Sequence, residues 1–210
     1  MIKTKVIGRV FRQDEIADQI YDMWIETELA QGARPGQFVC VYTKNAAALL
    51  PRPISICEVN EEKTMLRLVY RTVGTGTNEF AAYHAGTEIS LLGPLGNGFP
   101  VEKAAGKRVF LIGGGIGIPP MLQLSKEIKK AGQAYCELSV LGYRNELFLN
   151  TDLEKYSQVY VATEDGSAGT KGTVLDAIKE KGLSGDVIFA CGPMPMLRAI
   201  KEYAAANNME

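Results

Sequence analysis

Short apolar runs separated by turn signals occupy the first hundred residues. In Met65–Arg71, Leu66, Leu68 and Tyr70 share one face of a strand, and Arg67, Val69 and Arg71 share the other. This alternation is typical of a β-strand, and the spacing of the runs predicts an all-β barrel or sandwich. The runs are Lys3–Val10, Ile20–Glu28, Gln37–Tyr42, Ile54–Asn60 and Met65–Tyr70.

The second half of the chain alternates strands with helices. Apolar side chains recur at helical spacing in Pro119–Lys130, which ends before Gly132. Such alternation predicts a parallel sheet with right-handed crossovers. We therefore expect two domains, residues 1–100 and 101–210, with the boundary near Gly98–Lys107. The predicted strands are Arg108–Ile112, Glu137–Leu141, Gln158–Ala162 and Asp186–Ala190; the other predicted helices are Thr173–Lys181 and Pro195–Ala206.

Composition narrows the class of protein. The 210 residues include 23 Lys and Arg against 24 Asp and Glu, a balance that argues against nucleic acid as a partner. There is no cationic leader, and the apolar runs fall short of the about 18 residues that a membrane span needs. Four widely separated cysteines without a CxxC motif indicate reduced thiols, a cytoplasmic protein and no metal site.

A glycine-rich segment, Gly113-Gly114-Gly115-Ile116-Gly117-Ile118-Pro119-Pro120, follows one predicted strand and opens a helix. Glycines let a diphosphate approach the backbone, and a helix N-terminus adds positive potential. Proline suits the first helical turn, where its missing N–H is not needed. The segment departs from the GxGxxG fingerprint. It predicts a nucleotide site, and the alternative is a turn that only packs strand against helix.

A second loop, Cys191-Gly192-Pro193-Met194-Pro195-Met196, also lies between a strand and a helix. Ligands of open α/β sheets sit at the carboxyl ends of strands, so the two loops are expected to flank one crevice. A small polarisable Cys191 side chain suits contact with a nicotinamide ring. The alternative is a buried cysteine that merely precedes a turn.

A third signal lies in the β half. Arg52-Pro53-Ile54-Ser55 supplies a cation and a hydroxyl, and Gly74-Thr75-Gly76-Thr77 supplies a turn with hydroxyls and backbone N–H groups. Arginine binds phosphate through two parallel hydrogen bonds, and such a turn forms an anion-binding concavity. Each signal is weak alone. Together they predict a second diphosphate site, separate from the first.

The order of these motifs resembles the ferredoxin–NADP reductase superfamily, and within it the electron-transfer subunits of dihydroorotate dehydrogenase B. The resemblance covers nearly the whole chain. It implies an N-terminal antiparallel β-barrel that binds FAD and a C-terminal α/β domain that binds NAD(P). The residues that carry it are Arg52–Ile56, Tyr70-Arg71, Gly76-Thr77, Gly93–Phe99, Gly113–Pro120, Thr163–Ser167 and Cys191–Met196.

The resemblance also implies residue roles. Arg52, Gly76 and Thr77 would hold the FAD diphosphate, and Pro53, Ile54 and Ser55 would border the isoalloxazine. Ser55 would donate a hydrogen bond to the flavin, and Ile54 replaces an aromatic residue common in the superfamily. Ser55 and Cys191 are therefore the candidate catalytic residues. The remaining implied ligands are Val69, Tyr70 and Arg71 on the other side of the flavin, and Gly114, Gly115, Gly117, Cys191, Gly192 and Pro193 for the nicotinamide nucleotide.

Members of the resembled family carry a C-terminal cysteine segment that binds [2Fe–2S], which requires four ligands. The four cysteines of this chain lack suitable spacing, and the sequence ends at Glu210. Either the natural protein continues past Glu210 or this member lacks the cluster, and we favour the first.

These expectations define a function. Hydride would pass between NAD(H) and FAD, held at about 3–3.5 Å, and electrons would move on to a catalytic dehydrogenase subunit that interconverts dihydroorotate and orotate in pyrimidine biosynthesis. Arg144 after the second strand favours NADP on charge grounds, whereas the resemblance favours NAD, which we expect. The alternatives are a ferredoxin, sulfide dehydrogenase or hydrogenase-type reductase subunit, and a non-catalytic flavin-binding assembly or sensor subunit.

Overall fold

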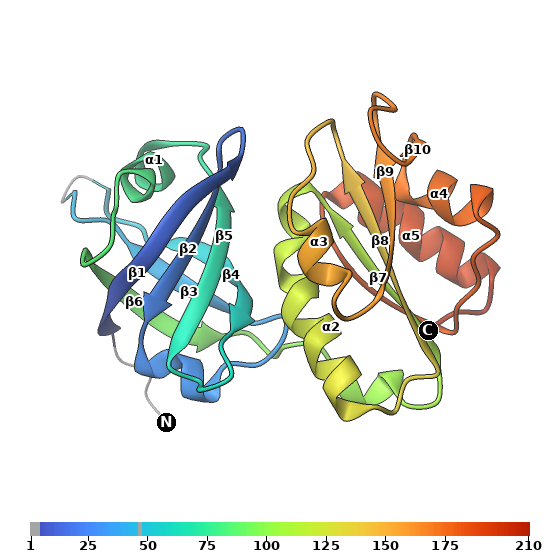
Figure 1. The fold of residues 1–210 in the computed structure, drawn as a ribbon, viewed down its shortest axis with the longest axis horizontal. Helices are drawn as coiled ribbons and strands as arrows, with labels where there is room; N and C mark the ends of the chain where they lie inside the picture. Colours follow the sequence, from blue (N-terminus) through green and yellow to red (C-terminus); the bar gives the residue numbers. More distant parts are fainter. Residues whose placement is uncertain (1–4, 46–47) are drawn as a thin grey trace. The chain divides into compact units, whose positions relative to one another are not determined.

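A computed structural model describes residues 5–45 and 48–210, and Figure 1 shows its elements. The chain divides into two compact units, one that ends at Gly98 and one that spans Phe99–Glu210. The first holds a closed antiparallel barrel and the second a parallel sheet, so the fold class predicted from the sequence is confirmed.

Six strands form the barrel in the order β1-β2-β5-β4-β3-β6, with antiparallel neighbours. Two short helices connect them: η1 (Glu28–Gly32) follows β2, and α1 (Thr75–Ala81) follows β5. Sequence patterns predicted neither helix. The strands are β1 (Lys5–Ala17), β2 (Ile20–Glu26), β3 (Phe38–Tyr42), β4 (Arg52–Val59), β5 (Met65–Arg71) and β6 (Glu88–Leu95).

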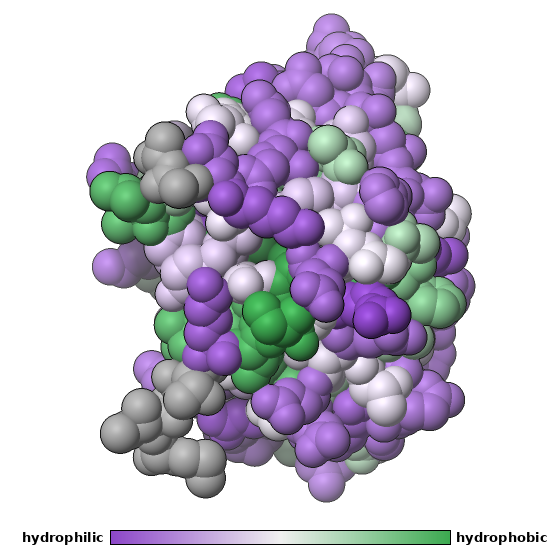
Figure 2. Space-filling model, turned by 90° about the vertical axis from the view of Figure 1, so that its left-hand side faces the viewer, coloured by the Kyte–Doolittle hydropathy of each residue, from purple (hydrophilic) through white to green (hydrophobic). Residues whose placement is uncertain are grey.

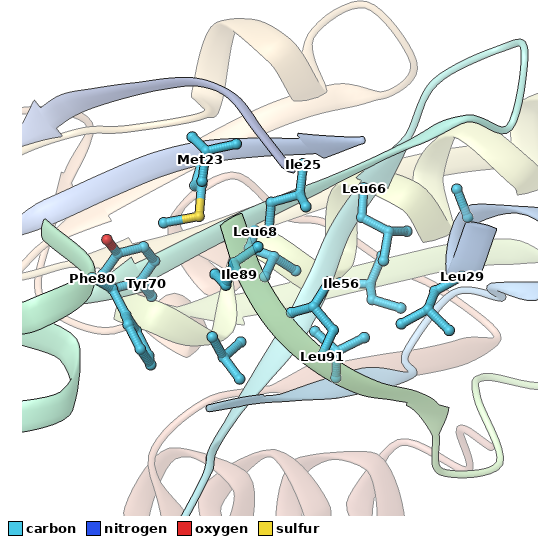
Figure 3. Close-up of a cluster of buried hydrophobic side chains, with 14 of the residues drawn as sticks. Met23, Ile25, Leu29, Ile56, Leu66, Leu68, Tyr70, Phe80, Ile89 and Leu91 are labelled. Carbon is cyan, nitrogen blue, oxygen red and sulfur yellow. The ribbon is translucent and has the colours of Figure 1, made fainter. Parts of the chain in front are cut away.

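The barrel core follows from the alternation along β5. Leu66, Leu68 and Tyr70 are at most 2% exposed. Figure 3 shows their side chains within the core cluster of the barrel. The opposite face of β5 is also covered: Arg67 is 7% exposed and Val69 is 2% exposed. The alternation therefore correctly predicts which residues of β5 share the core face. The other face is buried as well along most of the strand.

The pairing between β4 and β5 ends before the strands do. Its last pair toward this end of the barrel is Ile56 with Leu68. Beyond it, residues 52–55 of β4 pair with β3, while residues 69–71 of β5 pair with β2. We call this opening between two adjacent strands the fork.

The second unit is a five-stranded parallel sheet in the order β10-β9-β8-β7-β11. Helices α4 (Val174–Glu180) and α5 (Met194–Ala206) share a core with side chains of one sheet face. Helices α2 (Pro119–Ala131) and α3 (Asn150–Leu153) pack on the other face (Figure 1). The remaining elements are β7 (Arg108–Gly114), β8 (Cys136–Tyr143), β9 (Gln158–Thr163), β10 (Thr170–Lys171), β11 (Val187–Cys191), η2 (Val101–Ala104) and η3 (Gly115–Gly117).

Figure 2 shows one face of the molecule, largely polar, with apolar side chains gathered in its central part. On the barrel, the exposed large apolar side chains include Ile7, Phe11, Leu49, Leu50 and Val73. None of the helices in the described residues is both long and apolar enough to cross a membrane. Those residues also hold no group of three or more His, Cys, Asp or Glu side chains that could bind a metal ion.

Candidate functional site

The structure brings together Arg52 and the Gly74–Thr77 segment, the two halves of the diphosphate site predicted in the β half. Arg52 begins β4, and its side chain lies directly against Gly76 in the first turn of α1. A Cβ atom at Gly76 would stand only 2.6 Å from Arg52 Cζ, so a side chain at this position would push the guanidinium aside. Arg52 Nη1 donates to the carbonyl of Leu50, which fixes the guanidinium beside the turn.

The segment that contains Thr77 differs from the expected open turn. Gly74 precedes helix α1, and the Thr77 hydroxyl accepts hydrogen bonds from the backbone N–H groups of Val73 (2.9 Å) and Gly74 (3.3 Å). The same hydroxyl donates to the Gly74 carbonyl. The Thr77 side chain therefore stabilises the start of α1, and the assignment of Thr77 to a phosphate stays a prediction.

The fork contains the residues expected beside the flavin ring. Pro53, Ile54 and Ser55 lie on its β4 side, and residues 69–71 lie on its β5 side. Pro53 is exposed, Ser55 is half-buried, and Ile54 packs against the barrel core. Because the β4–β5 ladder has ended, the main-chain groups on the two sides of the fork do not pair with each other.

The Tyr70 side chain lies in the barrel core rather than at a surface (Figure 3). Its ring stacks on Tyr21 at 5.8 Å between centroids, and its hydroxyl donates to Gln13 Oε1 at 2.8 Å. Burial raises the pKa of Tyr70. Val69 and Tyr70 are both buried as whole residues, whereas Arg71 is partly exposed, and the assignment of the three to a flavin stays a prediction.

Gln13 is a residue that sequence analysis missed. It lies on β1, and its Nε2 lies within hydrogen-bond distance of the carbonyls of Phe80 (2.9 Å), Ala81 (3.1 Å) and Tyr83 (2.8 Å). These carbonyls lie in the last turn of helix α1 and just after it, so Gln13 holds the end of that helix against strand β1. No local pattern marks this role, because a glutamine in a strand is usually a solvated residue.

In the second unit, the two predicted nucleotide loops touch one another. Cys191 at the end of β11 pairs with Gly113 at the end of β7. A Cβ at Gly117 would lie 2.7 Å from Gly192 Cα, and a Cβ at Gly114 would lie 3.2 Å from Pro193 Cδ. At Gly117 glycine is required because the Cys191–Gly192 backbone packs directly against it, whereas at Gly114 the closest neighbours are the side chains of Met196 and Pro193.

Their place in the sheet indicates what the loops bind. Strand β7 has β8 on one side and β11 on the other, so the strand order reverses beside β7. Ligands of open α/β sheets bind at such a switch point, outside the carboxyl ends of the strands. Gly115 has a φ of 51°, and Pro119 occupies the first turn of α2. The loop thus leads a glycine-rich backbone into a helix N-terminus.

Cys191 is half-buried, and burial raises the pKa of its thiol. The side chain therefore remains a neutral thiol at neutral pH, because no described cation stabilises its thiolate. A neutral thiol suits packing against an uncharged ring better than nucleophilic attack. Pro193 precedes helix α5 and fixes the backbone where that helix begins.

Comparisons with known proteins match both units. A family model described as "Oxidoreductase NAD-binding domain" matches residues 111–202. The solved structure of an NADH-dependent reduced ferredoxin-NADP oxidoreductase aligns at TM-score 0.85 and 30% identity, over 95% of this chain and 72% of that chain. A ferredoxin NADP+ reductase from Neisseria gonorrhoeae, solved with FAD and NADP, shares the fold at TM-score 0.80 and 15% identity, over 97% and 91% of the two chains.

Fold and site together define a two-domain, FAD- and NAD(P)-dependent oxidoreductase of the ferredoxin–NADP reductase superfamily. Two curated proteins named "Dihydroorotate dehydrogenase B (NAD(+)), electron transfer subunit" narrow this class. That of Geobacillus sp. (strain WCH70) is 42% identical over 92% of this chain and 76% of its own. That of Bacillus caldolyticus is 42% identical over 94% of this chain and 79% of its own. The chain belongs to this family of electron-transfer subunits.

Proposed function

We propose that this chain passes hydride between NAD(H) and FAD on behalf of a catalytic subunit that interconverts dihydroorotate and orotate. Family membership supports the reaction. FAD binding is supported by the contact between Gly76 and Arg52, which we call the cradle, where a side chain at Gly76 would displace the guanidinium. This cradle and the adjoining fork fit a diphosphate joined to a planar ring.

Residue roles follow from these positions. Arg52 and the first turn of α1 bind the FAD diphosphate, with Gly76 providing the necessary space. Residues 53–55 and 69–71 border the ring system, and the exposed Pro53 and the partly exposed Arg71 are accessible members of the two strands. Ser55 is the hydrogen-bond donor on this ring. FAD, when bound, supplies a centre that takes up two electrons as hydride and can release them one at a time.

The second unit binds the nicotinamide nucleotide. Gly114, Gly115 and Gly117 let the diphosphate approach the start of α2, and Gly192 and Pro193 shape the opposite loop. The neutral Cys191 thiol borders the nicotinamide and excludes water from it. None of these groups needs to gain or lose a proton, since hydride transfer requires no acid or base.

The electron path beyond FAD lies with a partner. The relatives are named as subunits, which supports a hetero-oligomer with a catalytic dehydrogenase chain. Cys40 and Cys57 lie in the barrel, Cys136 and Cys191 in the second unit, and none of the four forms a disulfide in the described residues. These thiols do not provide a four-cysteine iron–sulfur site, so no step is assigned to one here. The free thiols support a cytoplasmic setting.

The test is anaerobic addition of NADH to the FAD-loaded protein. We expect NADH to bleach the oxidised flavin absorbance, and a protein whose flavin stays oxidised would leave only the assembly or sensor alternative. Adding the dihydroorotate-oxidising partner should then couple orotate formation to NAD+ reduction. A flavin that NADH bleaches but that never exchanges electrons with this partner would favour a different acceptor.

A further inference from the structure

The choice between NAD and NADP depends on what surrounds the end of β8. The adenosine ribose of a dinucleotide lies beyond the second strand of the nucleotide-binding unit, and an acidic residue there hydrogen-bonds the 2′-hydroxyl of NAD. In this chain, the residue that follows the second strand, β8, is a cation, the exposed Arg144. The positive charge of Arg144 taken alone favours NADP. The residues that lie next to Arg144 in the fold carry the opposite charge.

Two carboxylates lie beside Arg144. Pairing between β8 and β9 continues past its last strand pair, Tyr143 with Thr163. The Glu164 N–H donates to the Tyr143 carbonyl at 3.1 Å, and the Asp165 N–H donates to the Arg144 carbonyl at 3.4 Å. Glu164 and Asp165 are both exposed. The end of β8 thus carries two negative side chains next to one positive side chain.

The loop that holds these carboxylates, residues 164–169, is closed on itself. The Thr163 hydroxyl donates to the Ala168 carbonyl at 2.7 Å and accepts from the Ala168 N–H at 3.1 Å. Ser167 Oγ donates to the Asn145 carbonyl at 3.2 Å, which ties the loop to the segment after β8. The carboxylates are therefore held near the end of β8 before any nucleotide binds.

The Asp165 carboxylate is itself fixed. Its Oδ1 accepts the Ser167 N–H at 2.9 Å, and hydrogen bonds from Ser167 lower the pKa of Asp165. The group is ionised at neutral pH and has lost much of its rotational freedom. A fixed anion can accept a ribose hydroxyl, and it repels a 2′-phosphate.

We propose that Asp165, supported by Glu164, selects NAD over NADP by meeting the 2′-position of the adenosine ribose with negative charge. The inference rests on the proposed function, because it places the dinucleotide at the carboxyl ends of β7 and β8. It implies that Arg144 binds no 2′-phosphate in this chain.

The experiment compares Asp165→Ser, Glu164→Gln and the double variant with the unchanged chain. Serine keeps an oxygen that can accept the Ser167 N–H, so the loop is preserved while the charge is lost. Glu202→Gln, which removes an exposed carboxylate from α5, is the matched control. Calorimetry measures the affinity for 2′,5′-ADP and for 5′-AMP, and flavin reduction gives kcat/KM for NADPH and NADH.

We expect Asp165→Ser to raise the affinity for 2′,5′-ADP and the NADPH/NADH ratio of kcat/KM by about tenfold, and the double variant to raise both further. Glu202→Gln should change neither. Unchanged 2′,5′-ADP affinity in both Asp165→Ser and the double variant would overturn the inference, as would failure of both nucleotides to bind any form. If NADH fails to reduce the flavin although the nucleotides bind as expected, the proposed function fails and this inference stands.

Discussion

The Arg52 guanidinium and Gly76 are in contact, and a Cβ on Gly76 would stand 2.6 Å from Arg52 Cζ. Gly76→Ala should therefore displace Arg52 and weaken FAD binding at least about tenfold, or about 1.4 kcal/mol. Gly74→Ala is the matched control, because it lies in the same turn, has an extended φ of 176° and faces open space. Titration of the flavin-free protein with FAD measures both. If Gly76→Ala and Gly74→Ala bind FAD with equal affinity, the diphosphate does not bind beside Arg52 and Gly76.

Gln13 should control the position of α1. Gln13→Ala removes the donor to three carbonyls at the end of α1 and the acceptor of the Tyr70 hydroxyl. Losing the bonds to the Ala81 and Tyr83 carbonyls and to the Tyr70 hydroxyl should lower the free energy of unfolding by about 1–3 kcal/mol, while the Phe80 carbonyl still accepts the Tyr83 N–H. FAD affinity should also fall, because α1 carries Gly76. Urea unfolding with FAD titration tests this, with the exposed Gln31→Ala as control; a loss of stability without a loss of FAD affinity would show that α1 does not position the site.

A buried ion pair should contribute strongly to barrel stability. Arg67 donates to both oxygens of Asp22, through Nε at 2.9 Å and Nη2 at 2.8 Å, and Nη1 contacts Glu58 at 3.1 Å. Asp22→Ala should destabilise the barrel by about 3–5 kcal/mol because it leaves a buried charge without its main partner. Removing both charges, in Asp22→Leu with Arg67→Met, should recover most of that loss. Thermal unfolding of the three proteins decides; a double variant as unstable as the single one would contradict this account.

Glu137 should make the second unit sensitive to pH. This half-buried residue of β8 accepts a hydrogen bond from Ser125 of α2, and burial raises its pKa from 4.5 to about 7 despite the nearby Lys129. The folded state therefore retains a proton that the unfolded state loses. The free energy of unfolding should fall by about 1–3 kcal/mol as pH rises from about 4.5 to about 7.

Glu137→Gln should flatten this dependence and stabilise the second unit above pH 7, whereas Glu202→Gln should leave it unchanged. Urea unfolding across this pH range gives the slope. A Glu137→Gln protein with the slope of the unchanged chain would mean that Glu137 ionises normally.

The second unit was largely predictable because its signals are local. The helix expected at Pro119–Lys130 runs to Ala131, with Pro119 in its first turn and Gly132 ending it at a φ of 63°. The glycine-rich and Cys191 loops were expected to flank one crevice, and the strand order brings them together at β7 and β11. Parallel strands place their carboxyl ends at one edge, so topology alone juxtaposes them.

The barrel site was less predictable because it depends on pairing between distant segments. Helix α1 begins Thr-Gly-Thr, a poor helix-forming sequence, and its end is held by Gln13 more than sixty residues earlier. For Tyr70, alternation indicated the face shared with Leu66 and Leu68, and this face is the core. The resemblance implies a place for Tyr70 beside the flavin, but it does not indicate that the whole residue is buried.

The fork between β4 and β5 bears on how such a protein acquires its prosthetic group. If every pair of adjacent strands in the barrel were hydrogen-bonded along its full length, some of these bonds would have to break before a ring system could enter. Here the pairing of β4 with β5 already ends at Ile56 and Leu68, while β4 stays paired with β3 and β5 stays paired with β2. In the proposed site, loading and release of the flavin would therefore require no breaking of hydrogen bonds between β4 and β5, and the barrel could be filled after it has folded. Amide hydrogen exchange should accordingly slow at the fork when FAD binds and stay nearly constant in the core of the barrel.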